Sequence, residues 1–551
     1  MTDTDVIVIG AGLAGLVAAT ELTRRGQRVI ILDAEPAASL GGQAFWSFGG
    51  LFLVDSPEQR RLGLRDSAEL AFSDWLGSAE FAAGAERGEG PDAMGYAWAQ
   101  RFVEFAAGPM REWLHELGVR WFPLVQWAER GGYLAGGHGN TLPRFHVTWG
   151  TGPGVLAPFL AAARFARSEG LLQIRFRHRV TDLVVTDGQV TGVRADVLAP
   201  TTAPRGEPTS REVTDQIELA AHAVVLATGG IGANHDLVRS AWPEAAGTLP
   251  EQLLSGVPDG TDGSGLQLAR DAGGAVVHAE RMWHYPEGIA MPEGIWSRHG
   301  VRILPGPSSL WLDSTGQRLP APLFPGFDAL GALEHLTTGG HPHSWFVLNK
   351  AIMNTEFALS GSDQNPDLTG KDLRLLAQRV LPGAVGPVEA FAQHSPDFVW
   401  ADTPAELAAG MNALTGSSDI DPAALNRLIE LRDAQVASGL GKDPQIAAIH
   451  HARGYVVDKR MRVAPPRPLT TAKDGPLLAV RLQVLTRKTL GGVHTDTSGR
   501  VLDARGEAIG GLYAAGEAAG FGGGGVHGRR ALEGTFLAGC LYSGTVVGTS
   551  I

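Results

Sequence analysis

The chain has 551 residues, of which 44% are hydrophobic and 19% are charged, a composition typical of a folded globular protein and not of a disordered one. Its formal net charge of −12 argues against nucleic acid and anionic membranes as main partners. Because Cys540 is the only cysteine, we expect no internal disulfide. The sequence shows no secretory signal pattern and no apolar run long enough for a membrane span, so we expect a cytoplasmic protein. We predict no metal site.

The first 35 residues carry the pattern of a dinucleotide-binding unit. An apolar strand at residues 6–9 runs into Gly10-x-Gly12-x-x-Gly15 and an alanine-rich helix, and a second strand ends at Asp33. In this pattern the first glycine permits a tight turn, the second admits a pyrophosphate and the third allows close helix–strand packing. Asp33 follows at the distance where a carboxylate accepts hydrogen bonds from the adenosine ribose.

A second glycine-rich loop follows directly and decides between two cofactors. Residues 39–51 read SLGGQAFWSFGGL. NAD needs no such loop, whereas the ribityl chain and tricyclic ring of FAD need further close approach of the main chain. The sequence therefore predicts FAD, and the loop residues expected to contact it are Gly41, Gly42, Gln43, Ser47, Gly49 and Gly50.

The order of motifs along the chain resembles one family. The loop is similar to that of the large flavoproteins related to fumarate reductase and succinate dehydrogenase flavoprotein subunits, flavocytochrome c and 3-ketosteroid dehydrogenases. Later segments resemble the same family in the same order: a strand pair at 179–196, an Ala-Thr-Gly-Gly turn within 221–234, a helix start within 261–274 and a terminal signature at 489–520.

This resemblance implies an α/β fold with two parts. A Rossmann-like FAD-binding domain would be built from both chain ends, residues 1–279 and 451–551, and the first part would carry a helical insertion at about 51–145. An α+β cap domain that holds the substrate would be inserted at 280–450.

The resemblance also implies how FAD is held. Glu517 would accept hydrogen bonds from ribityl hydroxyls, and the helix that follows residue 531 would direct its positive end at the pyrimidine ring. Ala44, Phe45 and Trp46 stand where covalent members of the family carry a histidine, so we expect non-covalent FAD. The further residues expected at the cofactor are Ala14, Ala34, Val180, Ala227, Thr228, Gly229, Gly516, Ala531 and Leu532.

In this family a hydride moves between flavin N5 and a carbon, a proton moves at the neighbouring carbon, and a carbonyl or carboxylate beside that carbon is polarised. The site therefore needs a general acid or base and an oxyanion binder. We expect His527, with Tyr285 or His284, on the substrate side of the flavin. The alternative for His284 and Tyr285 is packing within the cap.

Three basic residues are candidates for the group that binds the carbonyl or carboxylate oxygen. They are Lys488, Arg529 and Arg530. For the two arginines, the alternative is an ion pair with the pyrophosphate of the cofactor or with Glu533.

The substrate is expected to be a small carbonyl compound. Segments 488–492 and 527–531 depart from the fumarate reductase pattern, and the cap segment 337–340 lacks the arginine that donates the proton there. A ketosteroid-like substrate is therefore favoured, with an enoate or dicarboxylate reductase and a flavoprotein oxidase as alternatives. No second dinucleotide fingerprint is present, so the electron acceptor is expected to be external and is unknown.

Overall fold

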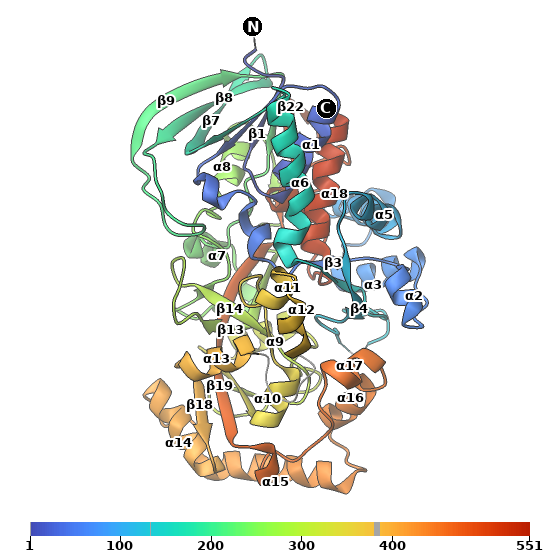
Figure 1. The fold of residues 1–551 in the computed structure, drawn as a ribbon, viewed down its shortest axis with the longest axis vertical. Helices are drawn as coiled ribbons and strands as arrows, with labels where there is room; N and C mark the ends of the chain where they lie inside the picture. Colours follow the sequence, from blue (N-terminus) through green and yellow to red (C-terminus); the bar gives the residue numbers. More distant parts are fainter. Residues whose placement is uncertain (1, 133, 379–385) are drawn as a thin grey trace.

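The structure is a computed structural model that describes residues 2–132, 134–378 and 386–551. In these ranges, nine strands form one sheet in which neighbouring strands come from opposite ends of the chain (Figure 1). The strands, in sheet order, are β6 (Leu172–Phe176), β2 (Val29–Asp33), β1 (Val6–Ile9), β10 (Ala223–Leu226), β22 (Ala508–Ala514), β8 (Gln189–Leu198) and β7 (His178–Thr186), with β9 (Val213–Ala220) beside β8 and β21 (Arg500–Leu502) beside β22.

The central strands are parallel and buried on both faces. β1 pairs with β2 and β10, and β10 pairs with β22, all in parallel. Val6 and Val8 face one hydrophobic cluster, which contains α1 (Leu13–Arg24), α6 (Thr151–Ser168) and α18 (Thr535–Ser550). Ile7 and Ile9 face a second cluster on the other side. Continuous apolar strands are what a parallel sheet covered on both faces requires.

A second sheet occupies the far half of the molecule. In sheet order its strands are β15 (Leu310–Asp313), β16 (Ser344–Asn349), β19 (Leu477–Thr489), β13 (Met282–Ala290), β14 (Gly300–Leu304) and β17 (Ala358–Leu359), with β11 (Leu254–Ser255) and β18 (Phe398–Ala401) also beside β19. The long strand β19 runs from this sheet toward the first one and ends at the cofactor signature. The predicted α/β fold, a Rossmann-like domain from both chain ends with an inserted α+β cap, is confirmed; its residue boundaries stay predictions.

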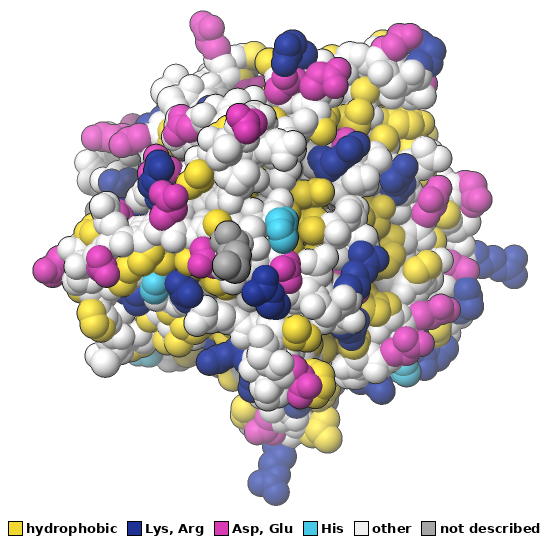
Figure 2. Space-filling model, turned by 90° about the horizontal axis from the view of Figure 1, so that it is seen from above, with side chains coloured by type: hydrophobic (Ala, Val, Ile, Leu, Met, Phe, Trp, Pro, Cys, Tyr) yellow, Lys and Arg dark blue, Asp and Glu magenta, His cyan; other side chains and the backbone are white. Residues whose placement is uncertain are grey.

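Helices cover both sheets. The remaining ones are α2 (Pro57–Arg61), α3 (Ala68–Ala79), α4 (Ala93–Ala106), α5 (Pro109–Glu116), α7 (His235–Ala241), α8 (Ser264–Asp271), α9 (Ala329–Thr338), α10 (Lys350–Glu356), α11 (Pro366–Thr369), α12 (Leu373–Gln378), α13 (Gly386–His394), α14 (Pro404–Thr415), α15 (Pro422–Ser438), α16 (Pro444–Ala452) and α17 (Val456–Met461). None of the helices in the described ranges combines the length and apolar character needed to traverse a bilayer. Figure 2 shows side chains of both charge signs scattered over the end of the molecule that carries the termini.

A buried ion-pair cluster holds together the segment that lies between the second glycine-rich loop (residues 39–51) and α6. Here α2 to α5 pack beside a small sheet of β3 (Gly50–Phe52), β5 (Phe145–Thr148) and β4 (Trp121–Gln126). The Arg144 side chain is fully buried just before β5, where Nη2 lies 2.7 Å from Asp66 Oδ1 and Nη1 also pairs with Asp74. The cluster therefore ties α3 to the strand that leads into the cofactor region.

We predict that Arg144→Ala lowers the free energy of unfolding by about 3–5 kcal/mol, because it leaves two buried carboxylates without their cation. Arg60→Ala removes an exposed pair with Asp55 and serves as the matched control, with no measurable change. Chemical denaturation of both variants and the parent protein checks this. Equal stability of the Arg144→Ala variant and the parent would contradict the assignment.

Candidate functional site

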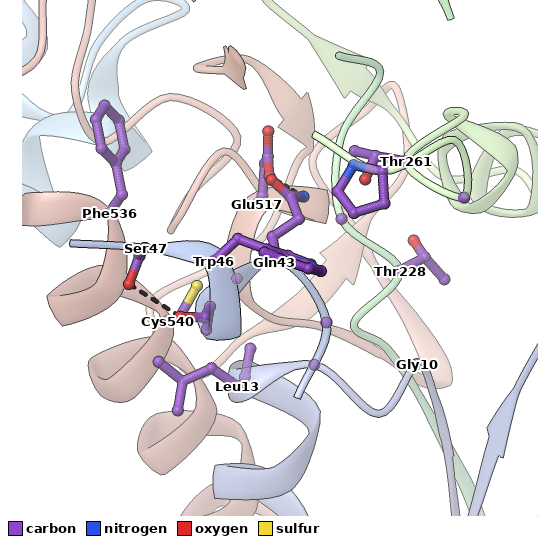
Figure 3. Close-up of a pocket in the computed structure, with 18 of the residues that line it drawn as sticks. Gly10, Leu13, Gln43, Trp46, Ser47, Thr228, Thr261, Glu517, Phe536 and Cys540 are labelled. Atoms are coloured by element: carbon purple, nitrogen blue, oxygen red, sulfur yellow. Dashed lines mark hydrogen bonds between the residues drawn. The ribbon is translucent and has the colours of Figure 1, made fainter. Parts of the chain in front are cut away.

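One long cavity opens along the carboxyl ends of the parallel strands. It begins at Asp33 and Val180, passes the Gly10–Gly12 turn and Glu517, and reaches Tyr285 on the second sheet. Figure 3 shows part of its lining, with side chains from both ends of the chain. The edge at the carboxyl ends of strands is where open α/β sheets bind their ligands.

The first glycine turn is a close approach of bare main chain. A Cβ on Gly10 would lie 2.5 Å from the carbonyl oxygen of Ala227, and a Cβ on Gly15 would lie 2.1 Å from that of Gly10. A Cβ on Gly12, by contrast, would meet nothing within 4 Å. Gly12 therefore faces the cavity at the N-terminus of α1, where main-chain N–H groups bind a phosphate.

Asp33 closes one end of the cavity. Its carboxylate accepts hydrogen bonds from the main-chain N–H groups of Ala11 (2.7 Å) and Glu35 (2.8 Å). Burial raises the pKa of Asp33 to about 6. A ligand that donates further hydrogen bonds would therefore stabilise the ionised form of this carboxylate.

Glu517 anchors the middle of the cavity. Its carboxylate accepts hydrogen bonds from the main-chain N–H of Thr489 (3.0 Å) and from Gln43 Nε2 (2.9 Å), while Lys488 Nζ donates to Gln43 Oε1 (2.7 Å). Nearby, the buried hydroxyl of Thr228 lines the cavity and has no hydrogen-bond partner among the described residues. A polyhydroxyl chain such as ribityl supplies both donors and acceptors to this wall, so these residues fit FAD.

The far wall comes from the second glycine loop and α18. A Cβ on Gly49 would lie 2.4 Å from the main chain of Thr151, and Gly534 caps α18 with φ at 92°. Both positions admit only glycine, and they bring main chain to the cavity. Cys540 of α18 also lines it; burial raises the pKa of this thiol to about 12, so the thiol stays protonated.

A polar cluster marks the end of the cavity on the second sheet. The Tyr285 hydroxyl donates to Glu533 Oε1 (2.9 Å), and Arg302 Nη1 donates to the same oxygen (2.8 Å). The Arg302 guanidinium also stacks on the Tyr285 ring at 3.8 Å and lies 3.3 Å from Glu287. Burial and the negative charge of Glu533 raise the pKa of Tyr285 well above its ordinary value, so its hydroxyl keeps its proton.

Most of the residues predicted at the cofactor line this cavity. Those that do are Gly10, Gly12, Ala14, Asp33, Ala34, Gly42, Gln43, Ser47, Gly49, Gly50, Val180, Ala227, Thr228, Gly229, Gly516 and Glu517. The others support it from behind: Gly15 packs on Gly10, Gly41 packs on Leu156, and Ala531 and Leu532 are buried in the two cores.

Of the residues predicted to be catalytic, Tyr285 and Lys488 line the cavity. His284 points to the other side of β13, where it stacks on Trp242 and Nδ1 accepts the main-chain N–H of Arg487 (3.0 Å). Burial and nearby His235 lower the pKa of His284 to about 3. This arrangement corresponds to the packing alternative.

His527, Arg529 and Arg530 also lie outside the cavity lining. His527 stacks on Trp75, donates to or accepts from Thr535 (2.8 Å), and burial lowers its pKa to about 3. Arg529 pairs with Glu334 (2.7 Å), and Arg530 lies within 4 Å of three carboxylates. These carboxylates belong to Glu80, Asp328 and Glu334.

Three residues that are candidates for a functional role were not predicted from sequence motifs. Arg302, Glu533 and Arg487 all line the cavity. Arg302 lies in the otherwise apolar segment GVRIL. A charged residue in such a strand is rarely buried without a partner, and this is the sequence feature that indicates a functional role. Glu533 is predicted from the sequence only as a partner of Arg529 or Arg530, whereas it accepts hydrogen bonds from Tyr285, Arg302 and Trp283.

Comparison with known proteins agrees with this geometry. The family model described as FAD binding domain matches residues 5–537. A KsdD-like steroid dehydrogenase of Mycobacterium tuberculosis (strain CDC 1551 / Oshkosh) is 56% identical over 545 residues, 99% of this chain and 95% of the relative. Another of Mycolicibacterium smegmatis is 56% identical over 537 residues, 98% of this chain and 96% of the relative.

Solved structures of the same architecture include 3-ketosteroid Δ1-dehydrogenase from Sterolibacterium denitrificans in complex with 1,4-androstadiene-3,17-dione. It superposes with a TM-score of 0.66 at 17% identity, over 99% of this chain and 98% of the other. These matches confirm the resemblance predicted from the motifs and the FAD cofactor.

We predict that Gly12→Val gives a folded protein that cannot bind FAD, because its Cβ meets no protein atom within 4 Å and the side chain occupies the phosphate cradle. Gly15→Val, the contrasting variant, forces its side chain onto a main-chain oxygen and should destabilise the fold itself. Flavin absorbance and the melting temperature of the flavin-free proteins separate the two. Full FAD occupancy in Gly12→Val would refute the placement of the pyrophosphate.

The affinity for FAD should depend on pH through Asp33. Burial raises the pKa of Asp33 in the folded protein to about 6. The ionised carboxylate, which would accept hydrogen bonds from the ribose hydroxyls, is therefore present above pH 6 and is lost as the pH falls through 6. Binding should be roughly tenfold weaker at pH 5 than at pH 8. Asp33→Asn should abolish this dependence in fluorescence titrations, and an unchanged pH profile in that variant would exclude Asp33 as its source.

Proposed function

Because the chain belongs to the FAD binding domain family, and within it to the KsdD-like steroid dehydrogenases, we propose that it dehydrogenates a ketosteroid beside its carbonyl group with non-covalent FAD. Dehydrogenation of a carbon–carbon bond by FAD is the chemistry of this family, and the steroid and the mode of attachment are the proposal. Non-covalent binding is supported by Ala44, Phe45 and Trp46 in the flavin loop and by the protonated Cys540 thiol.

The observation that carries the proposal is the Tyr285–Glu533–Arg302 cluster on the wall of the FAD cavity. FAD, when bound, supplies the hydride acceptor. The Tyr285 oxygen can take the proton from the substrate carbon while its own proton passes along the 2.9 Å hydrogen bond to Glu533. Arg302 positions both groups, since it stacks on the phenol and donates to the carboxylate.

Arg487 is the candidate that polarises the substrate carbonyl. Its half-buried guanidinium lines the cavity and donates to the main-chain oxygen of Gly256 (2.5 Å). In the described part of the chain no carboxylate lies within ion-pair distance of it, so further N–H groups can reach a carbonyl oxygen. Lys488 is instead occupied by Gln43, and Leu304 and Leu485 supply apolar wall for a hydrocarbon skeleton.

The direct test is anaerobic bleaching of the bound flavin by a panel of 3-ketosteroids, simple cyclic ketones and succinate. We expect bleaching by ketosteroids and none by succinate. The apolar wall at Leu304 and Leu485 suits a hydrocarbon skeleton and offers nothing to a second carboxylate. Electrons then leave to an external acceptor, which a dye supplies in the assay. Bleaching by the dicarboxylate alone would replace the steroid proposal.

We predict that Tyr285→Phe keeps FAD but slows bleaching by about 10²- to 10⁴-fold, the usual contribution of a positioned acid or base. Tyr455→Phe is the matched control, because that hydroxyl donates to the main-chain oxygen of Val125 (2.7 Å) away from the cavity. Stopped-flow absorbance measures both rates. A Tyr285→Phe rate equal to that of the control would remove Tyr285 from the mechanism.

A further inference from the structure

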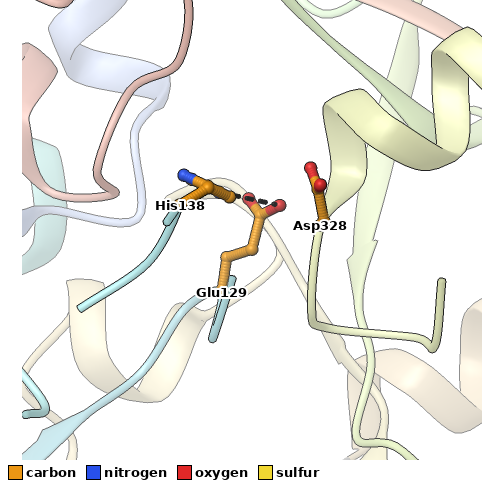
Figure 4. Close-up of side chains that lie close together, drawn as sticks. All are labelled: Glu129, His138 and Asp328. Carbon is orange, nitrogen blue, oxygen red and sulfur yellow. Dashed lines mark ion pairs between the residues drawn. The ribbon is translucent and has the colours of Figure 1, made fainter. Parts of the chain in front are cut away.

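Three metal-ligating side chains meet behind Arg302. Glu129 and His138 belong to the segment between β4 and β5, and Asp328 precedes α9. One ligand atom from each lies within 4.8 Å of the others, and His138 Nε2 is 3.9 Å from Glu129 Oε1. Figure 4 shows the imidazole and the Glu129 carboxylate facing each other, with Asp328 on the opposite segment.

The hydrogen bonds around the cluster orient its atoms as ligands. His138 Nδ1 lies 3.1 Å from Ser78 Oγ, which also accepts the main-chain N–H of Gly139 (3.1 Å). In the tautomer in which Nδ1 donates this hydrogen bond, the Nε2 lone pair is free to bind a cation. Asp328 keeps one oxygen on the main-chain N–H of Gly331 (2.9 Å).

Two buried atoms of the cluster lack a partner. His138 Nε2 and Glu129 Oε2 have no hydrogen-bond partner among the described residues, and their side chains are only 6% and 3% exposed. Buried polar atoms are nearly always satisfied in proteins. His138 Nε2 and Glu129 Oε1 face each other at 3.9 Å, too far for a direct hydrogen bond and far enough for a cation to bridge the two atoms.

The local charge is also negative. Glu129, Glu287 and Glu533 lie within 4 Å of Arg302. Glu80, Asp328 and Glu334 lie within 4 Å of Arg530, and Arg529 also pairs with Glu80 and Glu334, so six carboxylates face three guanidinium groups. Such an excess in a buried place favours bound protons or a bound cation.

We propose that Glu129, His138 and Asp328 bind a divalent first-row transition metal such as Zn²⁺. One imidazole with two carboxylates is a ligand set for Zn²⁺ or Mn²⁺, whereas Mg²⁺ and Ca²⁺ prefer oxygen alone. Zn–N and Zn–O bonds of about 2 Å draw the three ligand atoms roughly 1 Å closer together. The metal would link the β4–β5 segment to α9.

The site adjoins the catalytic cluster without being part of it. Glu129 Oε2 lies 3.8 Å from Arg302 Nη2, so a metal that takes up Glu129 leaves Arg302 to Glu287 and Glu533. The proposal does not rest on the steroid substrate, because it concerns residues outside the FAD cavity.

The test is calorimetric titration of the FAD-loaded protein with Zn²⁺ after treatment with chelator, with zinc content measured by mass spectrometry. We expect one equivalent of Zn²⁺ and no binding of Mg²⁺. His138→Ala should weaken Zn²⁺ binding at least about 100-fold and abolish the rise in melting temperature that Zn²⁺ gives the parent. His335→Ala, on the exposed end of α9, should bind as the parent does.

Two conservative variants keep the test meaningful if His138→Ala folds poorly. Glu129→Gln and Asp328→Asn retain oxygen acceptors for the main-chain N–H groups of Ala329 and Gly331, so flavin absorbance should be normal while Zn²⁺ binding falls at least about tenfold. No stoichiometric Zn²⁺ in the parent, or equal binding in all variants, would overturn the site.

Discussion

The close approach of two bare main-chain segments governs the whole cofactor region. Gly10 sits against the carbonyl of Ala227 so tightly that no Cβ fits, and this contact sets β1 beside β10 at the edge where the cavity opens. Because β22 pairs with β10, residues near 515 reach the same edge from the other end of the chain. A site built from such remote segments exists only when the entire sheet is formed.

Strand geometry then sorts the side chains at the substrate end. Trp283 and Tyr285 both reach Glu533, whereas His284 between them faces Arg487 and Trp242. Side chains alternate across a regular strand, so His284 and Tyr285 point to opposite faces of β13. A strand predicted over residues 282–290 would therefore place the side chains of His284 and Tyr285 on opposite faces.

More of the residues predicted to hold the cofactor line the cavity than of those predicted to be catalytic. Gly10, Gly12 and Asp33 act through local backbone geometry, which short motifs encode. His527 lies in a run of turns, where no period relates residue number to direction, and its ring enters an aromatic cage. Arg302 carries no motif, since its role arises from pairing of β13 with β14 that places it opposite Gly288.

The cluster around Arg302 is difficult to explain by stability. Burial raises the pKa of Glu287 to about 7, despite the nearby guanidinium of Arg302. Replacing buried ion pairs by apolar residues of similar volume is often neutral or stabilising. Tyr285, Glu533 and Arg302 nevertheless meet where the FAD cavity ends, with a second group of unsatisfied atoms at Glu129 and His138 directly behind. Proton transfer needs charge that is desolvated and held in place, which is the role proposed for this cluster.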